Sequence, residues 1–249
     1  MTFLSRKFFI TLGVVATVFS AAYGAQAYVI DSFQSVGGTG IRDVAHNYDV
    51  GMHSSTWRGS SILGGQRQIT SNITAIDTPA GAPGAHMGVS NGILSLGNDQ
   101  GVHSVLSILW GGLDNGGLGG FDATSAGTQG GIGFSVSTDK AGLQFDFSIC
   151  SAGGNCSTYS FLSDGSDNQT FSLLFSEIAD STSGTGAAFG SIDSFSLTAF
   201  SPTNDDSWDI RVGQVGSIPP VSEPSMFVML LVGVGLILYR RRQFMLRAV

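Results

Sequence analysis

The sequence predicts an all-β protein whose body is a single β-sandwich of jelly-roll or immunoglobulin-like form. Apolar and polar residues alternate with a period of two along several segments, as in strands that bury one face. Clusters of Gly, Ser, Asn and Asp at 111–122, 163–168 and 181–186 separate these segments and supply turn residues. No convincing helical pattern lies between them. A barrel and a short β-solenoid are the alternatives, and the absence of a repeat of fixed period disfavours the solenoid.

The N-terminal segment, residues 1–27, has the three parts of a secretory signal peptide. Two basic residues precede an apolar run at 8–19, and Ala25 and Ala27 form an A-x-A cleavage site. The run is shorter than the roughly 20 apolar residues that a transmembrane helix needs. We therefore expect export through the Sec machinery, cleavage after Ala27 and a mature N-terminus at Tyr28.

The body, residues 28–217, shows the strand pattern most clearly at 143–149, where every second residue is apolar. About ten short strands are expected over its length. The apolar stripes are Leu143-Phe145-Phe147-Ile149, Ile132-Phe134-Val136, Leu106-Ile108-Trp110, Phe171-Leu173-Phe175 and Phe195-Leu197.

Two cysteines, Cys150 and Cys156, lie at the end of the clearest strand and at the start of the next. An oxidising compartment makes a disulfide the default for such a pair, and the intervening SAGGN supplies the glycines that a hairpin needs. A metal or redox pair is disfavoured because the C-x-x-C spacing and further cysteines are missing.

Catalytic residues are not predicted. Gly88 to Gly92 matches the G-x-S-x-G pattern of hydrolases around Ser90, but the motif needs a strand-to-helix turn, and the only downstream histidine is His103, thirteen residues on, with Asp99 between. Asn91-Gly92 instead predicts a tight hairpin turn. Glu177 is the one Glu of the body, and no pair of carboxyl groups suited to glycoside hydrolysis can be assigned from sequence.

Metal ligands and cofactors are not predicted either, although two groups of residues have suitable ligand atoms. His46, Asp49 and His53 could hold zinc, but no fourth ligand is indicated by spacing. Two acidic stretches could hold calcium, and Asp and Asn are equally typical of turns. Their residues are Asp164, Asp167 and Asn168 in one stretch, and Asp205, Asp206 and Asp209 in the other.

Aromatic residues raise the alternative of a carbohydrate-binding module, since exposed rings can stack on sugars. The candidates are Tyr48, Trp57, Trp110 and Trp208. Trp110 ends an apolar strand and is expected in the core, whereas Trp208 lies between acidic residues and is expected to be exposed.

The C-terminal segment combines a linker and polar tetrad at 218–225, a hydrophobic helix with an arginine cluster at 226–242, and a tail at 243–249. The tetrad is Val221, Ser222, Glu223 and Pro224, and the cluster is Arg240, Arg241 and Arg242. Arginines there favour a cytoplasmic location. The apolar run 226–239 spans about 21 Å as a helix, short of the roughly 30 Å of a bilayer core.

This order of elements resembles the PEP-CTERM sorting signal of exopolysaccharide-producing Gram-negative bacteria, with VSEP in place of the usual VPEP. The resemblance implies that exosortase, a membrane protease-transpeptidase, cuts at the tetrad after transient anchoring of residues 226–239 in the inner membrane. The mature protein then lacks a transmembrane helix. A single-pass protein that keeps its tail is the alternative.

Charge excludes one class of function. Between residues 28 and 220 five Lys and Arg stand against seventeen Asp and Glu, a net charge of −12 that repels nucleic acid.

Together these features predict a non-enzymatic protein of the cell surface or matrix, with a structural or adhesive role in exopolysaccharide or biofilm. An extracellular carbohydrate-binding module is the alternative, and a secreted hydrolase is a weaker one.

Overall fold

The computed structural model describes residues 27–34, 43–47, 49–77, 84–127, 129–179, 183–201 and 207–219. The predicted cleavage residue Ala25 and the predicted sorting signal, Val221 to Pro224 with Arg240 to Arg242, lie outside these ranges. Among the residues that the structure describes, no helix is long and apolar enough to cross a membrane.

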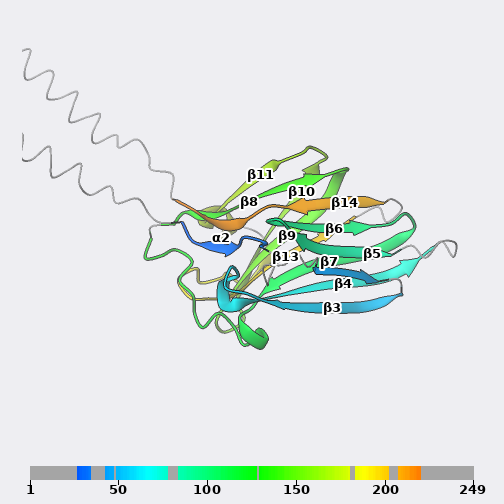
Figure 1. The fold of residues 1–249 in the computed structure, drawn as a ribbon. Helices are drawn as coiled ribbons and strands as arrows, with labels where there is room; N and C mark the ends of the chain where they lie inside the picture. Colours follow the sequence, from blue (N-terminus) through cyan, green and yellow to red (C-terminus); the bar gives the residue numbers. More distant parts are fainter. Residues whose placement is uncertain are drawn as a thin grey trace, which may run out of the picture.

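Two antiparallel sheets pack face to face, which confirms the predicted β-sandwich (Figure 1). Sheet A contains, in spatial order, β1 (Val29–Asp31), β15 (Val215–Ile218), β8 (Gly131–Thr138), β14 (Trp208–Val212), β6 (Ile93–Asn98), β5 (Ala85–Ser90) and β2 (Asp43–Asn47), with β11 (Gln169–Leu174) also paired to β8. Sheet B contains β12 (Ser183–Gly184), β10 (Cys156–Asp164), β9 (Ala141–Ser151), β13 (Ile192–Phe200), β7 (Val102–Trp110), β4 (Gln66–Ile76) and β3 (Gly51–Arg58). The chain passes repeatedly from one sheet to the other, as in jelly-roll sandwiches.

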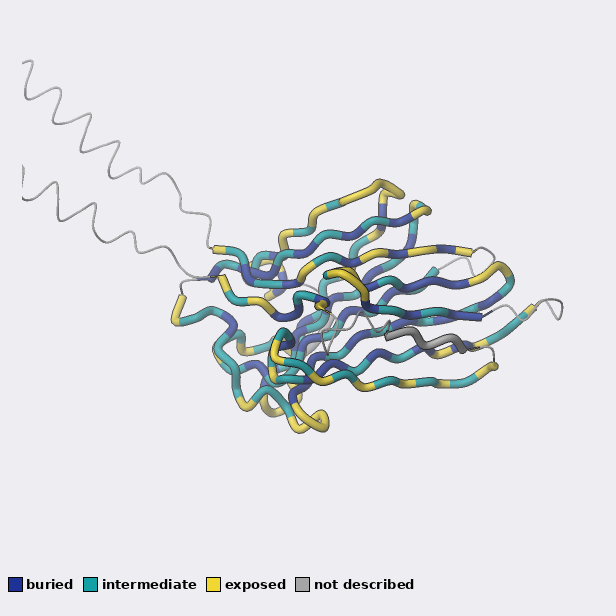
Figure 2. Tube along the Cα trace, in the orientation of Figure 1, coloured by how far each residue is buried: buried dark blue, intermediate teal, exposed yellow. Residues whose placement is uncertain are grey.

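The core lies between the two sheets and is built from the predicted apolar stripes (Figure 2). Leu143, Phe145, Phe147 and Ile149 are buried on β9, and the stripes of β7, β8 and β13 are buried opposite or beside them. Polar residues alternate with them on the outer faces, because successive side chains of a strand point to opposite faces. The alternation in the sequence therefore located the core correctly.

Three details differ from the sequence prediction. The described residues form fifteen strands instead of about ten, because short pairings such as β1 and β12 lack a full stripe. Phe175 does not continue the strand stripe but begins the short helix α2 (Phe175–Ala179), where it remains buried. Ile218, expected to open the linker, is the last residue of β15 and pairs with Gly131. Two short 3-10 helices, η1 (Leu63–Gly65) and η2 (Leu113–Asn115), complete the described elements.

Two predicted hairpins are present. Asn91 and Gly92 join β5 to β6 with positive φ angles of 53° and 80°, as a type I′ turn requires. Cys150 and Cys156 are directly opposite each other on β9 and β10 and form the predicted disulfide. A disulfide is typical of proteins that fold in an oxidising compartment.

The first strand is held in place by a buried ion pair. Asp31 of β1 accepts hydrogen bonds from Arg67 Nη1 at 2.9 Å and from Trp110 Nε1 at 2.9 Å, and all three side chains are buried. Before it, Tyr28 N donates to Ser217 Oγ at 2.8 Å. Burial raises the pKa of the Tyr28 hydroxyl, with a smaller contribution from Asp122. The predicted mature N-terminus is therefore built into the sandwich beside its last described strand.

Candidate functional site on sheet A

The outer face of sheet A carries the candidate site, and strand β14 lies at its centre. Along β14, Trp208, Ile210 and Val212 are buried, while Asp209 and Arg211 alternate with them and are exposed. This period-two pattern follows from the strand geometry and places both charged side chains on the outer face.

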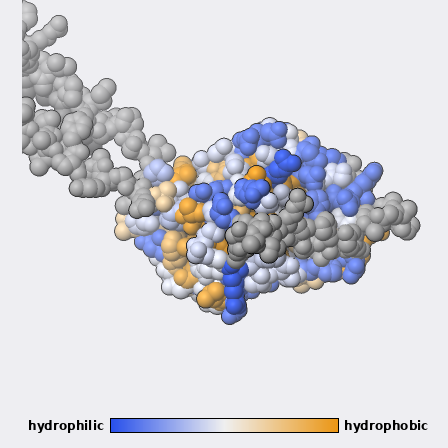
Figure 3. Space-filling model, viewed as in Figure 1, coloured by the Kyte–Doolittle hydropathy of each residue, from blue (hydrophilic) through white to orange (hydrophobic). Residues whose placement is uncertain are grey.

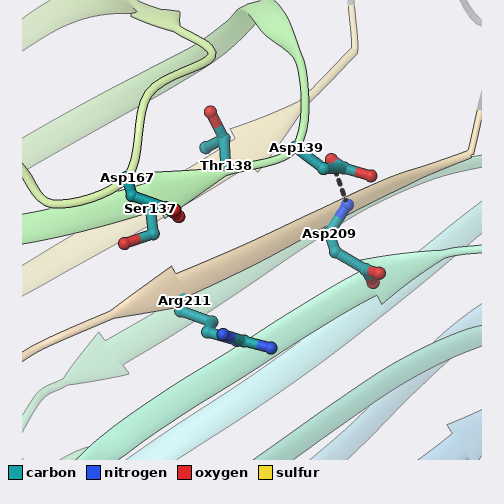
Figure 4. A pocket seen from close by; sticks show the side chains of 6 residues that line it. All are labelled: Ser137, Thr138, Asp139, Asp167, Asp209 and Arg211. Atoms are coloured by element: carbon teal, nitrogen blue, oxygen red, sulfur yellow. Dashed lines mark hydrogen bonds between the residues drawn. The ribbon is translucent and has the colours of Figure 1, made fainter.

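Arg211 lies where three depressions adjoin. It is opposite Ser137 on β8 and opposite Ser95 on β6. The largest depression, about 290 Å³, extends from Arg211 towards Ile93 and Asn168. A second, about 200 Å³, is shown in Figure 4, and a third, about 160 Å³, reaches His86. Most of the residues that line the three are polar, with Ile93, Leu96 and Ile210 as apolar members, and Arg211 is common to them all.

Asp209 and His86 meet across a glycine. His86 Nε2 lies 3.3 Å from Asp209 Oδ1, and the residue between them in the sheet register is Gly97. A Cβ atom at Gly97 would collide with both side chains. The absence of a side chain at position 97 therefore permits this contact.

Two hydrogen bonds from backbone N–H groups to side-chain oxygens position the acidic residues of this face. The backbone N–H of Asp209 donates to Asp139 Oδ1 at 2.8 Å, as the dashed line in Figure 4 shows. In the turn between β10 and β11, the N–H of Asn168 donates to Ser137 Oγ at 2.9 Å. These bonds hold Asp167 of that turn beside the depression.

The guanidinium of Arg211 is available to a ligand. Within the described ranges, no hydrogen bond or ion pair engages it. In Figure 4 its side chain points along the sheet, away from Asp139 and Asp167. Figure 3 shows that hydrophilic residues gather over the part of the body where β10, β11 and β14 lie in Figure 1. An exposed guanidinium that no described residue binds, with carboxylates nearby, offers strong donors and strong acceptors together.

The prediction for Trp208 is wrong. Its side chain is 1% exposed, because residue 208 falls on the inward phase of β14. Trp110 is buried as predicted, and Trp57 packs partly against the core. Tyr48 lies outside the described residues. The tryptophans of the described ranges therefore provide no fully exposed ring for sugar stacking.

The residues weighed as metal ligands are spread over the fold. His46 is on β2 in sheet A and His53 on β3 in sheet B, where His53 Nε2 contacts the Asp49 carbonyl at 3.1 Å. Among the described residues, no three His, Cys, Asp or Glu side chains gather as a metal site would need. Asp164 accepts hydrogen bonds from the Ser166 side chain and N–H, which lower its pKa and form a turn.

The two acidic stretches do meet at one point. Asp167 and Asp209, from the two different stretches, line the same depression. Asp209 lies on a strand and not in a loop, while Asp205 and Asp206 lie outside the described residues.

The residues weighed for catalysis lie on three different elements, Ser90 on β5, His103 on β7 and Glu177 on α2. Ser90 ends β5 in the hairpin, so it does not lie on the strand-to-helix turn of hydrolases. His103 Nε2 lies 2.6 Å from Asp77 Oδ2, and Glu177 Oε2 accepts a hydrogen bond from the Leu174 N–H beside α2.

Sequence reasoning missed Arg211 as a functional residue. The signal was present in the alternation of Trp208-Asp209-Ile210-Arg211-Val212, which predicts a strand with two charged side chains on one face. Its proximity to Ser95 and Ser137, more than seventy residues earlier, depends on sheet pairing and has no local signal.

The sequence matches no protein-family model and no curated protein. Among solved structures, the chain is similar to the family 11 carbohydrate-binding module of the cellulosomal cellulase Lic26A-Cel5E of Clostridium thermocellum, with 13% identity and a TM-score of 0.41 over 78% of this chain and 95% of that chain. A structure of the family 11 module from the same organism in complex with a β-1,3-1,4-mixed-linked tetrasaccharide gives 14% identity and a TM-score of 0.41, over 78% and 97%. A family 29 carbohydrate-binding module complexed with mannohexaose gives 12% identity and a TM-score of 0.32, over 60% and 92%.

Proposed function

We propose that this protein is an extracellular carbohydrate-binding module whose binding surface is the outer face of sheet A around Arg211. The observation that carries the proposal is the guanidinium of Arg211, exposed at the junction of three polar depressions and engaged by no described residue. Sugar hydroxyls both donate and accept hydrogen bonds. A face that combines a guanidinium, serine hydroxyls and carboxylates can satisfy both functions at neighbouring positions.

The shape of the face favours an extended ligand. The depressions adjoin one another across β8, β14 and β6 and are lined mainly by polar side chains. Sites for compact small molecules are usually enclosed and predominantly apolar. Adjoining polar depressions fit several consecutive units of a polysaccharide.

The charge of the face favours an uncharged polysaccharide. Asp139, Asp167 and Asp209 surround the single Arg211, so the local charge is negative. The body as a whole is also acidic, since five Lys and Arg stand against seventeen Asp and Glu between residues 28 and 220. Acidic polysaccharides would be repelled at low salt, whereas neutral ones lose nothing from this potential.

The binding experiment uses the full chain in mild detergent and titrates it with neutral and acidic polysaccharides by calorimetry. We expect binding of at least one neutral polysaccharide and a loss of at least about tenfold in affinity in Arg211→Ala, since charge-assisted hydrogen bonds contribute about 1.5–3 kcal/mol. Arg58→Ala is the matched control, because Arg58 is exposed on the other sheet and contacts Asp114. Equal binding by Arg211→Ala and the parent would refute the proposed surface.

Delivery to the cell surface through the C-terminal signal is the second part of the proposal. It rests on the sequence order of tetrad, apolar run and arginines, together with the signal peptide and the disulfide. We expect intact-mass measurement of the native product to show cleavage after Ala27 and loss of the C-terminal segment. Replacing Glu223 and Pro224 with alanine should leave export intact and block processing. A tail that persists equally in hosts with and without exosortase would favour the single-pass alternative.

A further inference from the structure

We propose that two copies of this chain associate through the free edge of β3, so that their two B sheets join into one continuous antiparallel sheet. The proposal rests on the unpaired backbone edge of β3. In sheet B, β3 pairs with β4 on one side, and no described residue pairs with its other side (Figure 1). This proposal is independent of the Arg211 face.

The β3 edge lacks the features that usually prevent edge pairing. Proteins protect edges with short strands, charged residues, proline or bulges. All eight residues of β3 pair with β4 without a register shift, from Gly51 opposite Ile73 to Arg58 opposite Gln66. The strand contains no proline, no lysine and no carboxylate, and its one charged residue, Arg58, is the last.

The other strands that have a single partner are shorter. They are β1 with three residues, β2 with five, β11 with six and β12 with two, counted within the described ranges. The longest row of unpaired backbone N–H and C=O groups among these strands is therefore that of β3. Another β-strand can form hydrogen bonds with all of these N–H and C=O groups, so the expected partner is an extended strand.

A second copy of β3 is a suitable strand. The exposed side chains on its outer face are Met52, Ser54, Thr56 and Arg58. An antiparallel pairing with its two-fold axis at Ser54 places Ser54 opposite Ser54, and Met52 opposite Thr56 of the other copy. Like-facing side chains are then opposite each other, as antiparallel pairing requires.

This arrangement brings no like charges together and covers an exposed apolar residue. Met52 is 73% exposed, the largest value among the large hydrophobic residues of the described part. The acidic body disfavours association elsewhere on the surface, whereas β3 contributes no carboxylate at this edge. The strand therefore adds no carboxylate of its own to the repulsion between two approaching copies.

The test measures the molar mass of the full chain in detergent by analytical ultracentrifugation, over about a hundredfold range of concentration. We expect a dimer whose dissociation constant rises at least tenfold in Ser54→Lys, because two lysines would face each other. High salt should restore part of the affinity. Ser160→Lys is the matched control, since Ser160 is an exposed serine on the same face of sheet B, on β10.

Cross-linking tests the register. Directly opposite Cβ atoms are about 4.5–5.5 Å apart, close enough for a disulfide after a small adjustment. Ser54→Cys should therefore form a covalent dimer under oxidation at least ten times more readily than Thr56→Cys, whose copies would lie four residues out of register. Circular dichroism verifies that each variant is folded.

Three results would overturn the proposal. A parent chain that stays monomeric means that water or another segment of the same chain covers the edge. A dimer that is unaffected by Ser54→Lys means association through the apolar terminal segments. A dimer that Ser160→Lys disrupts instead places the interface at β10.

Discussion

Arg67 on β4 and Arg211 on β14 are both strand residues of the sandwich, yet their environments are opposite. Arg67 is fully buried and forms an ion pair with Asp31 at 2.9 Å, beside the Trp110 indole. Arg211 is exposed, and within the described part of the chain nothing engages its guanidinium. One arginine is committed to the fold, and the other is left available to a ligand.

The difference indicates that stability and ligand binding depend on different residues of this protein. A buried charge that loses its partner keeps the cost of desolvation, whereas an exposed charge loses little when it is removed. We therefore expect substitutions in the Asp31 network to change the free energy of unfolding, and substitutions at Arg211 to change binding.

The largest effect is expected for Arg67→Met. It leaves the buried Asp31 carboxylate without its cation and should lower the free energy of unfolding by about 3–5 kcal/mol in urea denaturation. The double variant with Asp31→Asn should be less destabilised than the sum of the two single variants, because neither charge is then left alone. If the changes in unfolding free energy of the two single variants added up strictly in the double variant, Arg67 and Asp31 would not be coupled, and the contrast with Arg211 would be lost.

Trp208→Ala should cost about as much, about 3–5 kcal/mol, because a large buried ring leaves a cavity. Trp208→Phe keeps most of the ring, and no described group accepts a hydrogen bond from Nε1, so a cost below about 1.5 kcal/mol is expected. The measurement is again urea denaturation. If the Phe variant bound polysaccharide tenfold more weakly while folded, Trp208 would belong to the binding surface after all.

Loss of the disulfide should have an intermediate effect. Cys150→Ser with Cys156→Ser opens a small loop, for which chain entropy gives about 2.4 kcal/mol. Arg67→Met and Trp208→Ala should remain more damaging than this double variant. Thiol labelling of the native parent protein checks the premise, and labelling without added reductant would contradict the observed bond.

Arg211→Ala should change the free energy of unfolding by less than about 0.5 kcal/mol, as expected for an exposed residue without partners. Thermal and urea denaturation should give curves close to those of the parent, even where binding is lost. A destabilisation comparable to that of Arg67→Met would remove the distinction between the two arginines.

The smallest effect is expected at the half-buried carboxylate of Asp122. Hydrogen bonds from the Thr124 side chain and the Ala126 N–H lower the pKa of Asp122 below its ordinary value of 3.8. The stabilisation is therefore present above about pH 4 and is lost as the pH falls through the lower value of the folded protein. Asp122→Asn should reduce stability slightly at neutral pH and converge with the parent in strong acid. A difference that does not change with pH would contradict this origin.

Much of the fold could be predicted from the sequence. The stripe Leu143 to Ile149 gave the clearest strand and its buried face, because alternation is a direct consequence of strand geometry. Asn91-Gly92 gave a hairpin, and Cys150 with Cys156 gave a disulfide, because both depend on neighbours a few residues apart. Phe175 and Trp208 were misplaced, since a strand end and the phase of a short strand depend on packing.

The candidate site was predictable only in part. Asp167 and Asp209 were noticed as acidic residues, but their meeting at one depression with Arg211 was not foreseen. The C-terminal segment that resembles a sorting signal and the N-terminal signal peptide remain sequence predictions, since nearly all of their residues lie outside the described ranges.

By itself, the sequence determined the fold class, the hairpins and the inward faces of the long strands, because these follow from patterns over two to seven residues. Only the tertiary structure decided that β14 lies between β6 and β8, that Arg211 faces solvent between Ser95 and Ser137, and that Arg67 is buried against Asp31. Pairing of strands that are distant in the chain depends on the total packing of both sheets. No local pattern encodes it, which is why the strands that Arg67 and Arg211 lie beside could not be predicted from the sequence.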